Sequence, residues 1–284
     1  LGYDSVWLPE NHFGLNAIPD PLTLLASIAG GTSKIRLGTT SYLLTLRNPL
    51  QAAEQVAVLD QLSLGRVILG VGRGYAPDML KAFHVPPAEK RRIFSWTLGI
   101  MKDAWSGKRV TLDDNEQDGV EVHPLPYQKP WPPIWVAAFG PKALAQAGKL
   151  GLPYLCSPME SLEVLKRNYE VHREEMASNG NDAPDIVPLM RTVFISKDRN
   201  IIRSLKDEAA RKTENTRILE GETVDDWAII GEPLEVADRI NCYVEELGMN
   251  YLIATRIRTS AVDVNLSEES VELLADVSAS CLSS

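Results

Sequence analysis

Short apolar runs alternate with longer amphipathic stretches along the whole chain. A run of about four to eight residues that is apolar on both faces is typical of a parallel strand buried on both sides. The runs expected to form strands lie near residues 5, 36, 67, 134, 154, 189 and 251. The first three recur about every 31 residues, with a helix-like stretch in each interval, and this spacing predicts consecutive βαβ units and a parallel sheet.

The helix-like stretches carry start signals that can be read from the sequence. Two of them begin with a capping side chain followed by proline, at Asp20-Pro21 and Asn48-Pro49, which is the usual arrangement at a helix amino terminus. In the second helix the residues expected to face the core are Leu50, Ala53, Ala57 and Leu62. Further helices are expected over residues 88–105, 140–151, 160–178, 200–219, 229–247 and 266–282, the last capped by Ser267.

The regular spacing is interrupted between residues 75 and 133. A loop over Tyr75–Pro87 follows the strand that starts at Val67. The stretch 108–133, rich in acids, prolines and turn formers, is interpreted as an excursion, a hairpin and loop over the barrel mouth. Because it interrupts one repeating pattern, we expect a single domain over residues 1–284, with both segments as candidate lids.

Seven predicted βα units indicate an α/β fold, a (β/α)8 TIM barrel with an inserted excursion. The chain begins at Leu1, without methionine, a few residues before a buried strand. We therefore expect that the first βα unit is missing from this chain. A doubly wound open sheet is the competing architecture, but the Gly70–Gly74 cluster does not open directly into a helix and has no acid at dinucleotide-binding spacing.

Composition and charge limit the kinds of partner and site that we expect. The chain has 284 residues, 44% hydrophobic and 24% charged, with a formal net charge of -9, which argues against nucleic-acid or anionic-membrane partners. Its three cysteines show no paired spacing, so we expect a reducing, cytoplasmic setting without disulfides or a zinc site. The four histidines are scattered and no carboxylate cluster keeps ligand spacing, so no metal is expected.

In a barrel the active site lies at the carboxyl ends of the strands. The polar and small residues at these ends are Glu10, Asn11, His12, Thr40, Ser41, Arg73, Gly74, Ala138, Phe139, Gly140 and Ser157. Arg73 can bind a phosphate or carboxylate with its forked guanidinium, or it can pair with a neighbouring carboxylate for structural reasons. His12 can likewise be a structural histidine. A site with one arginine, one histidine and many small residues suits a bound cofactor that carries the chemistry.

Several motifs together resemble the bacterial luciferase-like superfamily of flavin-dependent monooxygenases and oxidoreductases. The matching segments run nearly end to end: residues 2–13, 37–39 with 48–49, 59–66 leading into 70–74, and 230–237 with 246–248. No single motif is specific, but the combination is. Members of this superfamily begin with a strand and helix upstream of the segment that matches residues 2–4, which agrees with a missing first unit.

The resemblance implies reduced FMN, or the related deazaflavin coenzyme, as cofactor. It places the flavin phosphate against Arg73 and Gly74, and Thr40-Ser41 beneath the isoalloxazine, often through a non-proline cis bond. It also places the phosphate near the helix start that contains Gly140, Lys142 and Ala143. Helix amino termini offer free N–H groups and a positive dipole to an anion.

The candidate catalytic residues are His12, Asn11 and Glu10. True luciferases carry two histidines after the glutamate, whereas here the first is Asn11, which cannot exchange a proton near neutral pH. His12 remains as the proton donor or acceptor. This departure disfavours aldehyde-oxidising luciferase chemistry.

The leading hypothesis is a reduced-FMN-using monooxygenase that acts on a small organic substrate with oxygen. A separate flavin reductase would supply the cofactor, and a homodimer is expected. One alternative is hydride transfer with the deazaflavin coenzyme. The other is a flavin-binding family member without turnover.

Overall fold

The computed structural model describes residues 1–113, 118–213, 221–257 and 262–281. They form two compact units, one of residues 4–137 and one of residues 1–3 with 138–284. Both units combine helices with parallel strands, so the predicted α/β class is confirmed. Within the described residues, no helix is both long and apolar enough to span a membrane. The single domain over 1–284 stays a prediction.

The strands of the 4–137 unit form a parallel sheet in the order β1-β2-β4-β5, with β3 beside β4. The register pairs Val6 with Leu37, and Leu69 with Ile134. Every residue of β4 is buried, as expected of an apolar run covered on both faces. The strands are β1 (Ser5–Leu8), β2 (Arg36–Thr39), β3 (Tyr42–Leu43), β4 (Val67–Gly72) and β5 (Ile134–Ala137).

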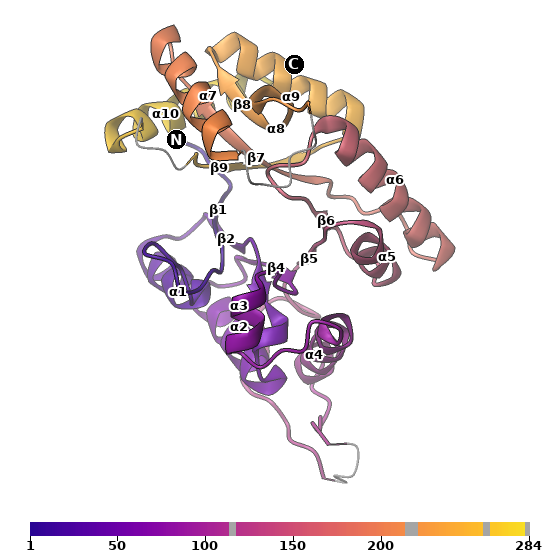
Figure 1. The fold of residues 1–284 in the computed structure, drawn as a ribbon. Helices are drawn as coiled ribbons and strands as arrows, with labels where there is room; N and C mark the ends of the chain where they lie inside the picture. The colour runs from indigo at the N-terminus through magenta and orange to yellow at the C-terminus, as the bar shows by residue number, and fades with distance from the viewer. Residues whose placement is uncertain (114–117, 214–220, 258–261, 282–284) are drawn as a thin grey trace. The chain divides into compact units, whose positions relative to one another are not determined.

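The helices of this unit start where the capping signals predict. The Asp20 side chain accepts from the Thr23 amide, and the Asn48 side chain accepts from the Leu50 amide. Helix α2 packs between α1 and α4 (Figure 1). The helices are α1 (Pro21–Gly31), the 3-10 turn η1 (Leu44–Leu46), α2 (Pro49–Leu62), α3 (Pro77–Ala82) and α4 (Lys90–Trp105). The short α3, inside the segment expected to be a loop, was not predicted.

One side chain of α2 points the opposite way to its prediction. Ala53 and Ala57 are buried, but Leu62 is 61% exposed. The buried stripe of α2 runs through Val56 and continues to Ser63. At 100° per residue, Leu62 falls on the solvent face of the same helix.

The excursion over residues 108–133 contains an antiparallel bridge between Val110 and Val120, which confirms a hairpin-like pairing there. Its later part is anchored by Gln128, whose backbone and side-chain amides both donate to the carboxylate of Asp60 at 2.8 Å. The same Gln128 side chain donates to the carbonyl of Val67, the first residue of β4. The excursion therefore meets the amino end of β4. The predicted position over the mouth at the carboxyl ends is wrong, because an insertion between a helix and the next strand starts at the amino ends.

The second unit contains a parallel sheet in the order β8-β7-β9 and the short strand β6. Strand β8 was not predicted, because it runs directly into the helix start at Glu232-Pro233, and the expected helix 229–247 takes in three of its four residues. The strands are β6 (Tyr154–Leu155), β7 (Pro188–Ile195), β8 (Ala228–Gly231) and β9 (Tyr251–Thr255). The helices are α5 (Pro141–Lys149), α6 (Leu162–Ser178), α7 (Arg199–Thr213), α8 (Val224–Trp227), α9 (Pro233–Leu247) and α10 (Val264–Cys281).

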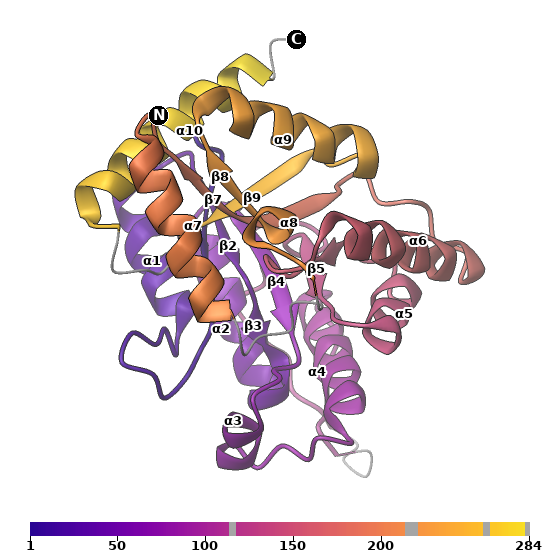
Figure 2. The same cartoon turned by 45° about the horizontal axis from the view of Figure 1, so that its top comes forward.

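Within this unit α10 lies beside α9 and packs on β7, and α5 packs on α6 (Figure 2). The predicted cap of α10 is wrong. Ser267 lies one turn inside the helix and donates to the Asp263 carbonyl, whereas the Asp263 side chain accepts from the Leu266 amide. The part of the predicted 200–219 helix after residue 213 lies outside the described residues.

Candidate functional site

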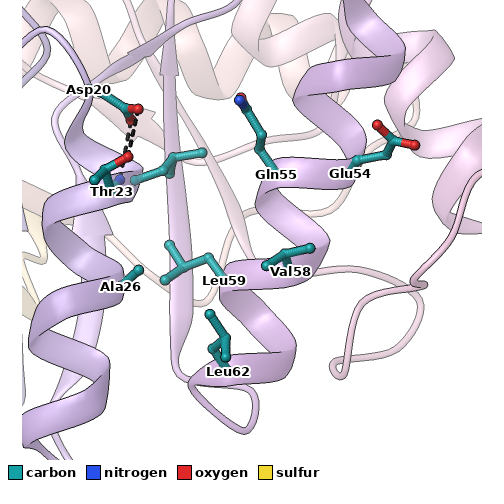
Figure 3. A pocket seen from close by; sticks show the side chains of 9 residues that line it. Asp20, Thr23, Ala26, Glu54, Gln55, Val58, Leu59 and Leu62 are labelled. Atoms are coloured by element: carbon teal, nitrogen blue, oxygen red, sulfur yellow. Dashed lines mark hydrogen bonds between the residues drawn. The ribbon is translucent and has the colours of Figure 1, made fainter.

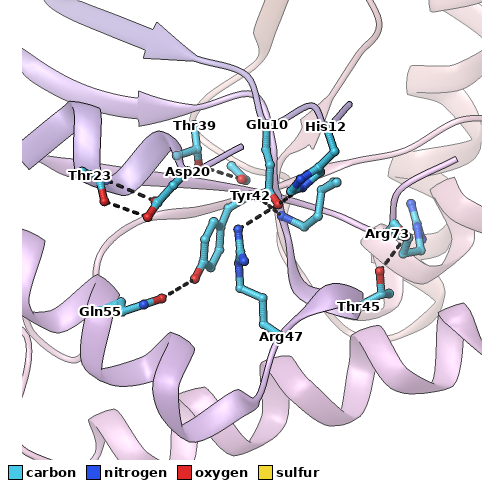
Figure 4. Close-up of polar contacts among 12 residues, drawn as sticks. Glu10, His12, Asp20, Thr23, Thr39, Tyr42, Thr45, Arg47, Gln55 and Arg73 are labelled. Carbon is cyan, nitrogen blue, oxygen red and sulfur yellow. Dashed lines mark hydrogen bonds and ion pairs between the residues drawn. The ribbon is translucent and has the colours of Figure 1, made fainter. Parts of the chain in front are cut away.

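Glu10 is the centre of a buried polar cluster at the carboxyl end of β1. Its Oε1 lies 2.9 Å from His12 Nε2 and 2.8 Å from an Arg47 terminal nitrogen, and its Oε2 accepts from the Leu43 amide at 2.9 Å (Figure 4). The Glu10 side chain is fully buried and that of His12 is 8% exposed. The predicted pair of Glu10 and His12 is thus brought together, and Arg47 joins it.

Asn11 has a different position from its two neighbours. Its backbone amide donates to the Ile18 carbonyl at 3.0 Å, and its side-chain oxygen accepts from the Ile18 amide at 2.7 Å. These two bonds close the base of the loop over residues 11–18. The amide therefore acts as a loop clamp, and the catalytic role of Asn11 stays a prediction.

Thr40 and Ser41 lie between β2 and β3, and the peptide bond between them is cis, as the resemblance implied. The Ser41 side chain rests against Gly72, where an added Cβ would lie only 2.2 Å from Ser41 Oγ. Thr39 donates to the Gly70 carbonyl across the sheet at 2.7 Å. Small residues in β4 therefore let the Thr40-Ser41 segment approach the strand closely.

Arg73 leaves the carboxyl end of β4 and is largely buried. Its guanidinium donates to the Ala137 carbonyl at 2.7 Å and lies 5.2 Å from the centre of the Phe94 ring. Burial, and then the nearby Arg91 charge, lower the pKa of Arg73 to about 10. Its cation is therefore retained at neutral pH but is poorly solvated, and a bound anion would offset that cost.

The backbone around Arg73 is fixed by its neighbours. The Thr45 hydroxyl donates to the Arg73 carbonyl at 2.8 Å. Gly74 follows with a φ of 69°, in the left-handed region that favours glycine. An added Cβ at Gly74 would also lie 2.5 Å from Met79 Cε. This turn directs the chain away from the strand while Arg73 stays at its end.

In the other unit, Gly140 precedes α5 with a φ of 72° and no side-chain cap. The Ala143 amide already donates to the Gly140 carbonyl at 3.1 Å. Within the described residues no such bond is formed by the Lys142 amide. Of the two amides predicted to bind phosphate, Lys142 is therefore the better placed.

The same unit holds a buried network that the sequence did not indicate. Arg191, fully buried, donates to the carbonyls of Ser157 and Glu160 at 3.2 and 2.5 Å. The Glu160 carboxylate accepts from Tyr154 and Asn168 at 2.9 and 2.8 Å, and burial raises its pKa. These bonds fix the loop after β6. The strand-end residue Ser157 thus contributes its backbone to a structural network.

A groove of about 250 Å³ runs between α1 and α2, and no predicted site residue is among those that line it (Figure 3). Its walls include Val58, 43% exposed, and Leu62, with Asp20 and Glu54 beside them. Within the described residues there is no cluster of three or more metal-ligating side chains.

Comparison with known proteins gives matches over most of the chain. The sequence profile of the luciferase-like monooxygenase family matches residues 1–201. The protein y4wF of Sinorhizobium fredii is 30% identical over 76% of this chain and 64% of its own length. The alkanal monooxygenase alpha chain of Photorhabdus laumondii is 28% identical over 65% of this chain and 52% of its own.

Two further similarities concern cofactors. The F420-dependent glucose-6-phosphate dehydrogenase of Kineococcus radiotolerans is 30% identical over 83% of this chain and 70% of its own length. The oxygenating component of 3,6-diketocamphane monooxygenase from Pseudomonas putida, solved with FMN, has a TM-score of 0.79 at 22% identity. That match covers 95% of this chain and 86% of the other, and it confirms the predicted fold class. The chain spans about three fifths of the length of the first curated relatives it matches.

Proposed function

Because this chain belongs to the luciferase-like monooxygenase family, we propose that it is a flavin-dependent oxidoreductase. More narrowly, it is a monooxygenase that uses reduced FMN and oxygen on a small organic substrate. The observation that carries the proposal is the buried cation of Arg73 at the carboxyl end of β4, beside the close approach of Ser41 to Gly72. A buried arginine at the carboxyl end of a strand suits a phosphate-bearing cofactor.

The residues of the 4–137 unit fit such a group. Arg73 would bind the phosphate, and Gly74 would supply the turn that keeps Arg73 at the end of the strand. Thr40 and Ser41 would contact the flavin ring. In the other unit, the amides at the start of α5 remain predicted contacts for the phosphate. When bound, reduced FMN supplies the electrons that activate oxygen.

His12 serves as the proton donor or acceptor of this cluster. Glu10 fixes the ring through Nε2, and Phe83 packs its ring 4.8 Å away, edge-on. The aromatic ring reduces contact of His12 with water. Of the two candidate lids, only Tyr75–Pro87 follows the carboxyl end of a strand, so it is the lid we retain.

Reduced-FMN binding under anaerobic conditions tests the proposal. The Arg73→Met variant is expected to bind reduced FMN about 10- to 100-fold more weakly, because a hydrogen bond to a charged group contributes roughly 1.5–3 kcal/mol. Arg66→Met is the matched control, since Arg66 donates to the carbonyls of Ala29 and Ile35 and has no predicted cofactor role. No binding by the unaltered chain, or equal binding by both variants, would refute the role of Arg73.

The deazaflavin coenzyme is the second candidate, favoured by the similarity to an F420-dependent dehydrogenase. In that case hydride transfer replaces oxygen chemistry. Parallel titrations with reduced FMN and the reduced deazaflavin coenzyme separate the two. Oxygen uptake in the presence of candidate substrates is expected only for the FMN enzyme.

The assembly is part of the same proposal. A homodimer is supported by apolar side chains exposed along the α1–α2 groove, Val58 and Leu62 among them. A separate reductase would supply reduced flavin, and a cytoplasmic location agrees with the free thiols of Cys156 and Cys242. Sedimentation of the chain, with Leu62→Glu as the variant expected to dissociate, tests the dimer.

A further inference from the structure

We infer that Arg47 is a positioning residue that determines which nitrogen of His12 carries the proton. Arg47 is one of the three donors that reach Glu10 within the described residues, with His12 and the Leu43 amide. The consequence for catalysis rests on the proposed function. The proton assignment itself does not, because it follows from contacts within this cluster.

Two of the three donors cannot change role. A guanidinium keeps its protons in a protein, and a backbone amide is always a donor. Arg47 therefore occupies one lone pair of Oε1, and Leu43 occupies Oε2. The Arg47 cation, 2.8 Å from Oε1, disfavours a proton on that oxygen. Toward His12, Glu10 therefore acts as an acceptor through Oε1.

The third contact is then determined. Because Glu10 acts as the acceptor, His12 Nε2, 2.9 Å from Oε1, must be the donor. In the neutral ring this leaves Nδ1 with the lone pair. Within the described residues no hydrogen bond reaches Nδ1; the ring is otherwise contacted by Phe83 and Phe13 at 4.8 and 5.7 Å between ring centres. Nδ1 is thus the atom that can take a proton from a substrate hydroxyl or bound water, while Nε2 keeps its own.

Arg47 is fixed for this purpose by packing. Its guanidinium carbon lies 4.1 Å from the centre of the Tyr42 ring, and the Tyr42 hydroxyl donates to Gln55 at 3.1 Å. Arg47 Nε is buried without a hydrogen-bond partner among the described residues, an arrangement that ordinarily destabilises a structure. Arg47 keeps this position despite the unpaired Nε, with its guanidinium end directed at Glu10 (Figure 4).

Without Arg47, the lone pair of Oε1 that it occupies becomes available. Glu10 can then bind a proton or attract a second proton onto the imidazole, and the single Nε2-protonated form is lost. Arg47→Met tests this, because it keeps the aliphatic stem and removes the cation. Arg47→Lys restores a cation beside Oε1 and is the conservative rescue.

Nitrogen-15 spectra of histidine-labelled chain report the proton directly, with His12 assigned by its loss in His12→Gln. We expect Nε2-protonated, Nδ1-unprotonated His12 in the unaltered chain, in Arg47→Lys and in the control Arg66→Met. We expect loss of this signal pattern in Arg47→Met. An Nδ1-protonated ring in the unaltered chain, or an unchanged pattern in Arg47→Met, would overturn the inference.

A second readout separates this inference from the proposed function. Reduced FMN is expected to bind Arg47→Met with unchanged affinity, and turnover with an accepted substrate is expected to fall at least about 10-fold. If the chain binds no flavin, the proposed function fails while the nitrogen-15 result still decides the role of Arg47. If turnover is unchanged despite an altered proton position, the catalytic part of the inference is wrong.

Discussion

Replacing Glu10 by glutamine removes one charge and almost no volume, so its effect measures the electrostatic role of the carboxylate. The carboxylate is fully buried and meets three donors, from His12, Arg47 and Leu43. A glutamine amide offers one oxygen and one NH₂ group. If the glutamine oxygen points toward His12 and Arg47, its NH₂ group faces the Leu43 amide. If the glutamine amide is turned round, its NH₂ group faces His12 and Arg47. Either orientation places donors against donors and leaves the Arg47 charge without its counter-ion.

The magnitude follows from this geometry. Removing one partner of a buried ion pair costs about 3–5 kcal/mol. The Arg47 side chain is 19% exposed, so water can partly solvate its charge and the lower figure applies. We therefore expect Glu10→Gln to lower the free energy of unfolding by about 3 kcal/mol, which corresponds to roughly 6–12 °C in melting temperature.

Urea unfolding followed by circular dichroism measures this change. Glu54→Gln, an exposed position on α2, is the matched control and should alter stability by less than about 0.5 kcal/mol. A loss below about 1 kcal/mol in Glu10→Gln would mean that the carboxylate is not the counter-charge of Arg47. A glutamine variant as stable as the control would refute the reasoning.

Three further outcomes are expected. Gly72→Ala should lower the free energy of unfolding by about 1–3 kcal/mol, and the melting temperature with it, because its Cβ would lie 2.2 Å from Ser41 Oγ. An unchanged melting curve would contradict the close approach. Burial raises the pKa of Cys156 to about 11. The Cys156 thiol should therefore stay protonated and unmodified by iodoacetamide at pH 8, while the exposed Cys242 reacts. Mass spectrometry of a variant with Cys281 replaced by serine measures both reactions. Modification of Cys156 in folded protein would refute this. Gln128→Ala, which removes the side-chain donor to Asp60, should cost about 1–3 kcal/mol in urea unfolding and leave flavin binding unchanged; weaker flavin binding would connect the excursion with the site.

Much of the fold could be predicted because its signals are local. The apolar run of β4 and the caps at Asp20 and Asn48 depend on residues within one or two turns of chain, and all three are confirmed. Strand β8 could not be separated from the following helix, because its apolar residues fit either periodicity and a strong helix start follows at once. The position of the excursion was wrong because turn-forming composition does not tell which end of the sheet a loop meets.

The site was predictable only in part, and for the same physical reason. Residues that follow a strand end, such as Glu10 and His12, could be grouped from topology alone. Arg47 stands before a helix start, and nothing in the local pattern shows that it reaches a carboxylate 37 positions earlier. The bonds of Arg191 to the loop after β6 are equally long-range. Contacts of this kind depend on how elements pack, which the order of residue types does not specify.

The attachment of Gln128 to Asp60 and to the start of β4 has a practical consequence. It places the part of the excursion around Gln128 at the amino end of β4, whereas Arg73 leaves the carboxyl end. The insertion is therefore a suitable place for a fluorophore, an affinity tag or a surface tether, provided that Gln128 is retained. Protein immobilised through this segment would keep the carboxyl end of β4 free of the attachment.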